Sequence, residues 1–119
     1  MAGFDNRSGF IFGDIVVASY AMPSQEQAEY QPAVIVSTST YNQQRDDVLI
    51  MGIAVQDRPD ASSGEMSVQR AEAAGLDRGA VFKPVMTTID QRHVRLILGR
   101  LEERDRQRLR HLLELIVGI

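Results

Sequence analysis

Short runs of β-branched and aliphatic residues, separated by polar segments, fill most of the chain as far as residue 98. The runs at Asp14–Tyr20, Pro32–Thr38 and Asp47–Ala54 predict three strands, because such residues suit a pleated, half-buried surface. Shorter strands are predicted further on, at Glu65–Val68, Ala80–Phe82, Met86–Ile89 and Val94–Leu98. The pattern therefore indicates a mainly β protein.

Glycine, proline and polar residues mark the predicted breaks. Pro32 is expected to open the second strand, where a missing N–H costs least, and Lys83-Pro84 to separate two short strands. Gly52 lies inside a strand and suggests a bulge or a close backbone approach. Tyr41–Asp46 is predicted to be a polar turn. The segment Ala18–Tyr30 is too long and too polar for a tight hairpin, so we expect it to cover a binding groove.

The hydrophobic period changes near the C-terminus. Apolar residues then recur three and four positions apart, which is one stripe of an amphipathic helix, at Leu109, Leu112, Leu113 and Ile116. Gly118 is placed to end this helix. An order in which all strands precede a single helix predicts a small antiparallel barrel or sheet with the helix packed on it.

Composition adds limits to this picture. A chain of 119 residues predicts one domain, which we place at 12–119 after a short flexible tail at 1–11. Cysteine is absent, and no apolar run approaches the length of a membrane helix, so we expect a cytoplasmic protein with no membrane partner. Residues 1–89 carry a net charge of −5 and residues 90–119 carry +2, which argues mildly against strong nucleic-acid binding by the whole molecule.

Few side chains suggest specific chemistry. His93 could act as a general acid or base at neutral pH, or be an ordinary residue at a strand end. Two histidines without nearby carboxylates at ligand spacing do not predict a metal site, and we expect no cofactor. Lys83 could point into a groove or into solvent. Other residues could contact a nucleic acid or serve only the fold, namely Tyr20, Tyr30, Tyr41, Ser24, Gln56, Thr87 and Thr88.

The ordered segments together resemble the MazF/PemK (Kid-like) toxin family over residues 12–119. The resemblance is carried by Gly13-Asp14-Ile15, Pro32-Ala33-Val34-Ile35-Val36-Ser37, Tyr41-Asn42, Val48-Leu49-Ile50, Gly75-Leu76, Phe82-Lys83-Pro84, Thr87-Thr88-Ile89-Asp90 and Leu98-Gly99-Arg100-Leu101. It implies an SH3-like antiparallel barrel with a C-terminal α-helix, a homodimer and a cognate antitoxin. It also implies cleavage of single-stranded messenger RNA without a metal, with the first long loop as a flexible gate over the RNA groove.

The chain departs from the family pattern at two positions. The family usually has arginine before the Pro-Ala-Val strand and threonine or serine near the end of the third strand, whereas this chain has Gln31 and Ala54. An arginine there would neutralise the charge that builds on the phosphoryl oxygens, which glutamine cannot do. Two hypotheses follow. One is a ribonuclease in which Gln31 occupies the arginine's place and Lys83 or His93 supplies the missing charge or proton transfer. The other is a non-catalytic toxin, similar to the gyrase poison CcdB, or a degenerate toxin acting as a regulator.

Overall fold

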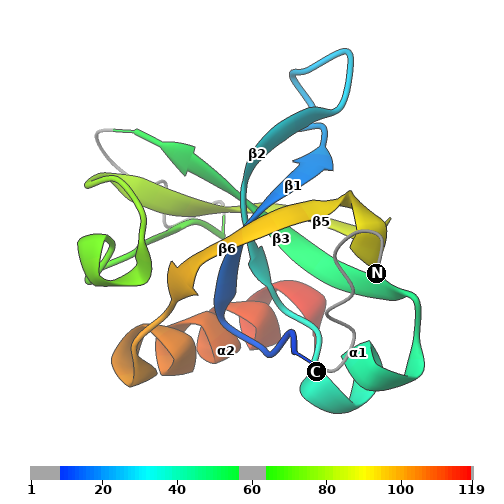
Figure 1. Cartoon of the computed structure of the whole chain (residues 1–119). Coiled ribbons are helices and arrows are strands. Elements are labelled where there is room, and N and C mark those ends of the chain that lie inside the picture. The colour runs from blue at the N-terminus through cyan, green and yellow to red at the C-terminus, as the bar shows by residue number, and fades with distance from the viewer. Residues whose placement is uncertain (1–8, 57–63, 119) are drawn as a thin grey trace.

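The computed structural model describes residues 9–56 and 64–118, which form one antiparallel sheet and a C-terminal helix (Figure 1). The strands lie in the order β4-β5-β3-β2-β1-β6. Their bounds are β1 Asp14–Tyr20, β2 Glu29–Ile35, β3 Asp47–Val55, β4 Met66–Ser67, β5 Ala80–Asp90 and β6 Val94–Arg100. Helix α2, Glu103–Val117, packs along one side of the sheet, and the β1–β2 loop projects at the opposite end (Figure 1).

The mainly β fold with a terminal helix is confirmed, but the sheet is not a closed barrel. Within the described residues, β4 and β6 remain its two edges. Helix α2 has the predicted apolar stripe, with Leu109 and Leu112 buried, and Gly118 ends it in the left-handed region at a φ of 79°. No helix in the described parts of the chain is long and apolar enough to cross a membrane.

Strand β2 starts and ends three residues earlier than the sequence predicted. Pro32 lies in its middle, opposite Val17 of β1, rather than at its start. The pairing of β2 with β3 begins only at Ala33, so at Pro32 one side of the strand has no ladder partner. A missing N–H on that side costs no ladder hydrogen bond, which explains why proline is tolerated there.

Strand β5 is continuous, whereas the sequence predicted two strands on either side of Lys83-Pro84. Its pairing with β3 slips between Met51, which lies opposite Met86, and Ile53, which lies opposite Phe82. Lys83, Pro84 and Val85 thus oppose the single residue Gly52. The predicted irregularity at Gly52 is confirmed, although the extra residues belong to β5.

The predicted turn at Tyr41–Asp46 is wrong, because most of it belongs to a short helix, α1, Ser39–Gln44. The Thr38 side chain caps α1 by accepting a hydrogen bond from the Tyr41 backbone N–H at 3.2 Å. A helix this short and polar has no apolar stripe, so hydrophobic periodicity could not reveal it.

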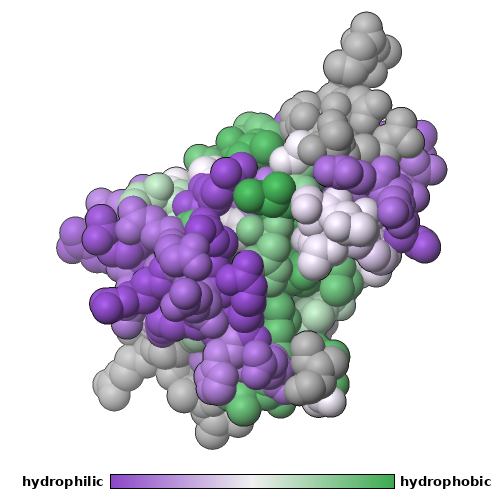
Figure 2. Space-filling view, turned by 90° about the horizontal axis from the view of Figure 1, so that it is seen from below, coloured by the Kyte–Doolittle hydropathy of each residue, from purple (hydrophilic) through white to green (hydrophobic). Residues whose placement is uncertain are grey.

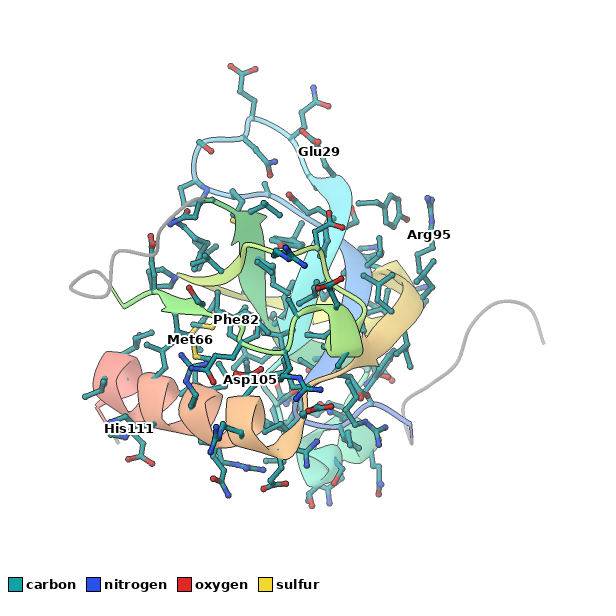
Figure 3. All side chains as sticks on the ribbon, turned by 90° about the vertical axis from the view of Figure 1, so that its left-hand side faces the viewer. Glu29, Met66, Phe82, Arg95, Asp105 and His111 are labelled. Atoms are coloured by element: carbon teal, nitrogen blue, oxygen red, sulfur yellow. The ribbon has the colours of Figure 1, made fainter. Side chains whose placement is uncertain are left out.

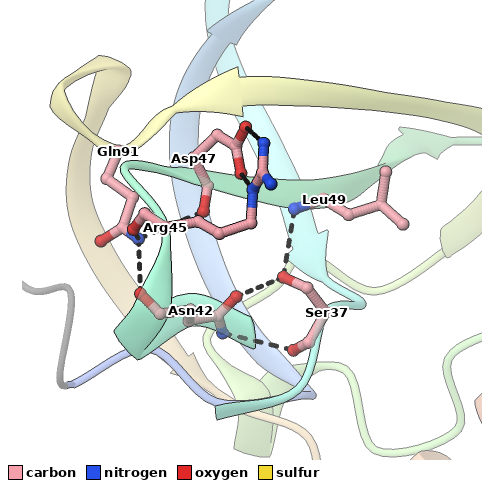
Figure 4. A network of polar contacts seen from close by, with 6 residues as sticks. All are labelled: Ser37, Asn42, Arg45, Asp47, Leu49 and Gln91. Carbon is pink, nitrogen blue, oxygen red and sulfur yellow. Dashed lines mark hydrogen bonds and ion pairs between the residues drawn. The ribbon is translucent and has the colours of Figure 1, made fainter. Parts of the chain in front are cut away.

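A buried polar network fixes α1 to the sheet (Figure 4). Asn42 is fully buried, and its amide contacts the Ser37 hydroxyl at 2.5 Å and the Phe10 carbonyl at 3.0 Å. Gln91 Nε2 donates to the Asn42 carbonyl at 2.9 Å, while Gln91 Oε1 has no hydrogen-bond partner. Phe10 itself is fully buried, so the body of the domain starts before residue 12; residues 1–8 of the expected tail lie outside the described residues.

Each face of the sheet has its own hydrophobic core. The helix-side cluster packs the sheet against α2 and includes Ile15, Val34, Met51, Phe82, Leu109 and Leu112. The loop-side cluster covers the opposite face and includes Phe10, Val16, Ala18, Tyr20, Ala33, Ile50 and Val94. Each fully buried large side chain in either cluster contributes about 1.5–3 kcal/mol through removal of apolar surface from water.

Charged side chains add to the attachment of α2. Asp105 is fully buried and accepts hydrogen bonds from the backbone N–H groups of Gln69, at 3.3 Å, and Arg70, at 2.9 Å. Arg108, one turn later, donates to Asp105 at 2.8 Å and to the Ser67 carbonyl at 3.0 Å. Helix α2 is therefore tied to the segment that follows β4 by charge-assisted hydrogen bonds.

The edge strand β6 is partly covered by η2, a single 3₁₀ turn at Glu72–Ala74. Their backbones approach closely at two glycines. A Cβ on Gly75 would collide with the Leu98 carbonyl oxygen, and one on Gly99 would collide with the Ala74 carbonyl oxygen. Beyond this contact, Leu96, Ile97 and Leu98 remain substantially exposed along β6.

Candidate functional site

Gln31, which the sequence analysis predicted to take the place of an arginine, lies on β2 opposite Ala18 of β1. It alternates with Ala33, so its side chain belongs to the face of the loop-side cluster. Gln31 Nε2 donates to the Tyr20 carbonyl at 2.7 Å and to Gln25 Oε1 at 2.8 Å, and Gln25 Nε2 donates back to Gln31 Oε1 at 3.2 Å. Both N–H donors of the Gln31 amide are therefore already used inside the protein.

The amide pair fastens the base of the β1–β2 loop, residues 21–28. Gln25 Oε1 also accepts from the Met22 backbone N–H at 2.8 Å, and the Gln25 N–H donates to the Met22 carbonyl at 2.9 Å. The Met22 side chain then packs on β3, where a Cβ added to Gly52 would lie 2.7 Å from Met22 Cε. We call this set, Met22, Gln25, Gln31 and Gly52, the loop latch. It holds the loop by neutral contacts, while Ser24 is exposed within the loop.

Tyr20, predicted among the substrate-binding residues, is instead part of the core. Only 4% of it is exposed, its hydroxyl donates to the Pro32 carbonyl, and the Ile53 N–H donates to that hydroxyl at 3.3 Å. Burial raises the pKa of the Tyr20 phenol to about 12. A ring enclosed in this way cannot stack on a base without local unfolding. Tyr30 is the more exposed ring, and the Arg95 guanidinium lies 3.7 Å from its centroid.

Lys83 and Gln56 are brought together, but with a third residue that the sequence analysis did not select. Lys83 Nζ forms an ion pair with Glu65 and donates to Gln56 Oε1 at 3.0 Å, and Gln56 Nε2 donates to Glu65 Oε1 at 2.8 Å. The Glu65 carboxylate neutralises the lysine, and the role of Lys83 as a substitute for a guanidinium stays a prediction. The positive charge is available to a phosphate only if Glu65 moves away.

His93 and the two threonines lie apart from Gln31. His93 belongs to the 3₁₀ turn η3, Gln91–His93, is exposed, and precedes Val94, which pairs with β1 on the side away from β2. Two strand spacings, about 10 Å, therefore separate the His93 end of β6 from Gln31. Thr87 pairs with Ile50 and Thr88 with Leu49, so both lie far along the sheet from Gln31. Ala54 brings no hydroxyl to this end of β3.

The side-chain hydrogen bonds of Gln31 in the described residues go to the Tyr20 carbonyl and to Gln25, neither of which carries a charge. No group of three or more histidine or carboxylate residues in those segments could hold a metal ion. Sequence reasoning missed Gln25, Met22 and Glu65, which become neighbours of the selected residues only through the loop and the β4–β5 pairing. Nothing in their spacing along the chain indicated these contacts.

Comparison with known proteins gives the family context. Residues 12–117 match the family described as "PemK-like, MazF-like toxin of type II toxin-antitoxin system". No curated protein sequence matches the chain significantly. Among similar solved structures is an endoribonuclease in complex with its cognate antitoxin from a mycobacterial species, with a TM-score of 0.74 and 15% identity over 93% of this chain and 97% of that one. MazF of Deinococcus radiodurans has a TM-score of 0.70 and 17% identity, over 92% of this chain and 97% of that one. The Mycobacterium tuberculosis toxin MazF-mt6 has a TM-score of 0.68 and 16% identity, over 89% of this chain and 97% of that one. At these identities the structural likeness establishes the fold.

Proposed function

Since the chain belongs to the PemK/MazF-like toxin family of type II toxin–antitoxin systems, we propose that it is a growth-inhibiting toxin that acts on single-stranded RNA. Its class of activity is that of the structural neighbours, endoribonucleolytic cleavage, and a cognate antitoxin restrains it. The supporting observation is the family match over residues 12–117, together with the sheet and terminal helix shared with those neighbours. We expect a toxin that acts on messenger RNA to work in the cytoplasm.

The loop latch favours a second function, RNA binding without efficient cleavage. Removing one preorganised donor from a transition-state site typically costs about 3–4 kcal/mol, or two to three orders of magnitude in rate. Here a charged donor is replaced by an amide whose two N–H groups already have acceptors. The same fold with this site would act as a binding toxin or as a regulatory partner of an active one.

An RNA cleavage assay separates the two functions. Purified protein is incubated with several long single-stranded RNAs, beside the double variant Gln31→Arg/Ala54→Thr. The matched control is Gln44→Arg, which adds the same charge at an exposed helix position. Cleavage by the unmodified protein supports the ribonuclease. Cleavage by the double variant alone supports the binding function, and cleavage by neither contradicts the assignment of this site to RNA chemistry.

Induced expression in a bacterial host tests the toxin role itself. Growth arrest with fragmented total RNA is expected for the ribonuclease, and growth arrest with intact RNA for a binding toxin. Normal growth at a high level of folded protein would contradict both forms of the proposal.

We infer that the toxin is a homodimer that buries the exposed apolar residues of β6. Three consecutive apolar side chains on an edge strand, Leu96, Ile97 and Leu98, are an unusual exposure for an isolated chain. Light scattering should report a dimer that Ile97→Lys weakens, while the exposed-residue control Val55→Lys leaves it intact. A monodisperse monomer at high concentration would contradict this assembly.

A further inference from the structure

A groove of about 430 Å³ lies between helix α2 and β4, and two of the residues that line it, Met66 and His111, are labelled in Figure 3. Met66 of β4 and Leu112 of α2 are nearly buried and form its floor. The remaining lining residues all come from α2, namely Arg104, Gln107, Arg108, His111 and Leu115. The groove lies on the opposite face of the sheet from Gln31, so it is separate from the candidate RNA site.

The lining of this groove combines apolar surface with positive charge. Arg104, Arg108, His111 and Leu115 follow one another at spacings of four, three and four residues, which places them on one stripe of the helix. Leu115 is 71% exposed, an unusual position for a large apolar side chain beside an apolar floor. Seen from the α2 side, the surface has a large hydrophilic area with a hydrophobic band beside it (Figure 2).

The groove has an excess of positive charge. Within the described residues, no carboxylate lines the groove and Arg104 has no ion-pair partner. Arg108 is partly neutralised by Asp105, to which it donates at 2.8 Å. The exposed carboxylates of α2, Glu103 and Glu114, are turned about 80–110° away from the stripe by the 100° rotation per residue.

We propose that this groove binds an acidic amphipathic segment of a partner protein. A bulky apolar side chain of the segment fills the space over Met66 and Leu112. Carboxylates on either side of it in the segment pair with the guanidinium groups of Arg104 and Arg108. This is the helix-in-groove or extended-segment mode of recognition, with charge supplying orientation. Identifying the partner with the antitoxin rests on the proposed function, whereas the existence of the groove and its charge do not depend on that function.

Two other occupants fit the groove less well. RNA phosphates would satisfy the arginines but would leave the apolar floor and Leu115 without a matching surface. A second copy of this chain, related by a twofold axis through the groove, would place the basic stripes against each other, and like charges across an interface are costly.

The test uses fluorescence anisotropy with a short fluorescein-labelled peptide of glutamate and leucine, with leucines three and four residues apart. A matched peptide has lysine for glutamate, and a single-stranded RNA oligonucleotide is the third probe. The variants are Arg104→Glu and Leu115→Ser, both at exposed positions. Their controls are Arg78→Glu, an exposed arginine outside the groove, and Val117→Ser, a half-exposed residue of α2 that does not line it.

We expect saturable binding of the glutamate peptide, weakened about tenfold or more by Arg104→Glu and about fivefold by Leu115→Ser, and changed less than about twofold by the controls. Binding should weaken at high salt and be absent for the lysine peptide. No saturable binding of the glutamate peptide, or equal losses in variants and controls, overturns the proposal. So does a result in which Arg104→Glu weakens only RNA binding, or in which Leu115→Ser dissociates a dimer of the free protein. Because none of these measurements uses RNA cleavage or growth, they succeed or fail independently of the proposed function.

Discussion

The two sides of the sheet hold their covering elements by different kinds of interaction. On the helix side, buried Asp105 receives two backbone N–H groups and the Arg108 guanidinium, so α2 is held by charge-assisted hydrogen bonds over a large apolar cluster. On the loop side, residues 21–28 are held by two glutamine amides and one methionine. Charged hydrogen bonds in a dry site are costly to break, whereas neutral, half-buried ones exchange readily with water. We therefore expect α2 to be the more rigid side and the β1–β2 loop to be the side that moves more easily.

The sharpest test of the rigid side is Asp105→Ala. This change leaves the Arg108 guanidinium and two backbone N–H groups without their acceptor, so we expect a loss of about 3–5 kcal/mol in the free energy of unfolding. Urea denaturation measures it, with Glu103→Ala on the exposed face of the same turn as the control. A loss below about 1 kcal/mol would show that the apolar cluster alone holds α2.

Alkaline titration tests the core residue that lies beneath the loop. The pKa of Tyr20 is raised to about 12, so an unfolded chain releases this proton near pH 10 while the folded chain keeps it. Between about pH 10 and pH 12 the folded state binds one more proton, and stability should fall by about 1.4 kcal/mol per pH unit. In Tyr20→Phe this component should disappear, after a loss of about 1 kcal/mol at neutral pH. If stability falls equally steeply with pH in both proteins, the raised pKa of Tyr20 is not the cause of the alkaline loss.

Gln25→Ala tests the neutral latch. It removes the amide partner of Gln31 and the acceptor of the Met22 N–H, which should cost about 1 kcal/mol. Amide hydrogen exchange in residues 21–28 should become faster, while exchange in α2 stays the same. The control is Gln27→Ala, an exposed residue of the same loop. Equal exchange in both variants would mean that the amide pair does not restrain the loop.

The smallest expected effect on stability comes from Gly52→Ala. The new methyl group would lie 2.7 Å from Met22 Cε, the flexible end of a side chain, so the methionine can move aside at a cost below about 1 kcal/mol. Amide hydrogen exchange in residues 21–28 should nevertheless become faster, because Met22 loses its packing position on Gly52. If stability falls by several kcal/mol while loop exchange is unchanged, the strain lies in the sheet and not in the latch.

Local pattern was enough to predict most of the fold. The β-branched runs gave β1 and β3, and the apolar stripe gave α2. The limits of β2 and the single β5 depended on pairing. Pro32 is harmless because the pairing of β2 with β3 begins only at Ala33, and Pro84 lies in a bulge opposite Gly52. Helix α1 depends on the Thr38 cap and the buried Asn42 network, neither of which leaves a hydrophobic period.

The candidate site was less accessible to sequence reasoning. Gln31 was selected through the family resemblance, and Lys83 with Gln56 through residue type. The surroundings of Gln31 depend on Gln25 of the β1–β2 loop, and the charge of Lys83 depends on Glu65, which comes next to it through the pairing of β4 with β5. A charge that looks available in the sequence is neutralised when the fold supplies a partner from elsewhere in the chain.

The backbone contact between η2 and β6 has a practical consequence for engineering this protein. Gly75 and Gly99 each face a carbonyl oxygen of the other segment, so neither position accepts a side chain while the segments remain packed. Mutational libraries should therefore keep both glycines fixed. A fusion or insertion that displaces η2 would expose more of the edge strand β6 to solvent.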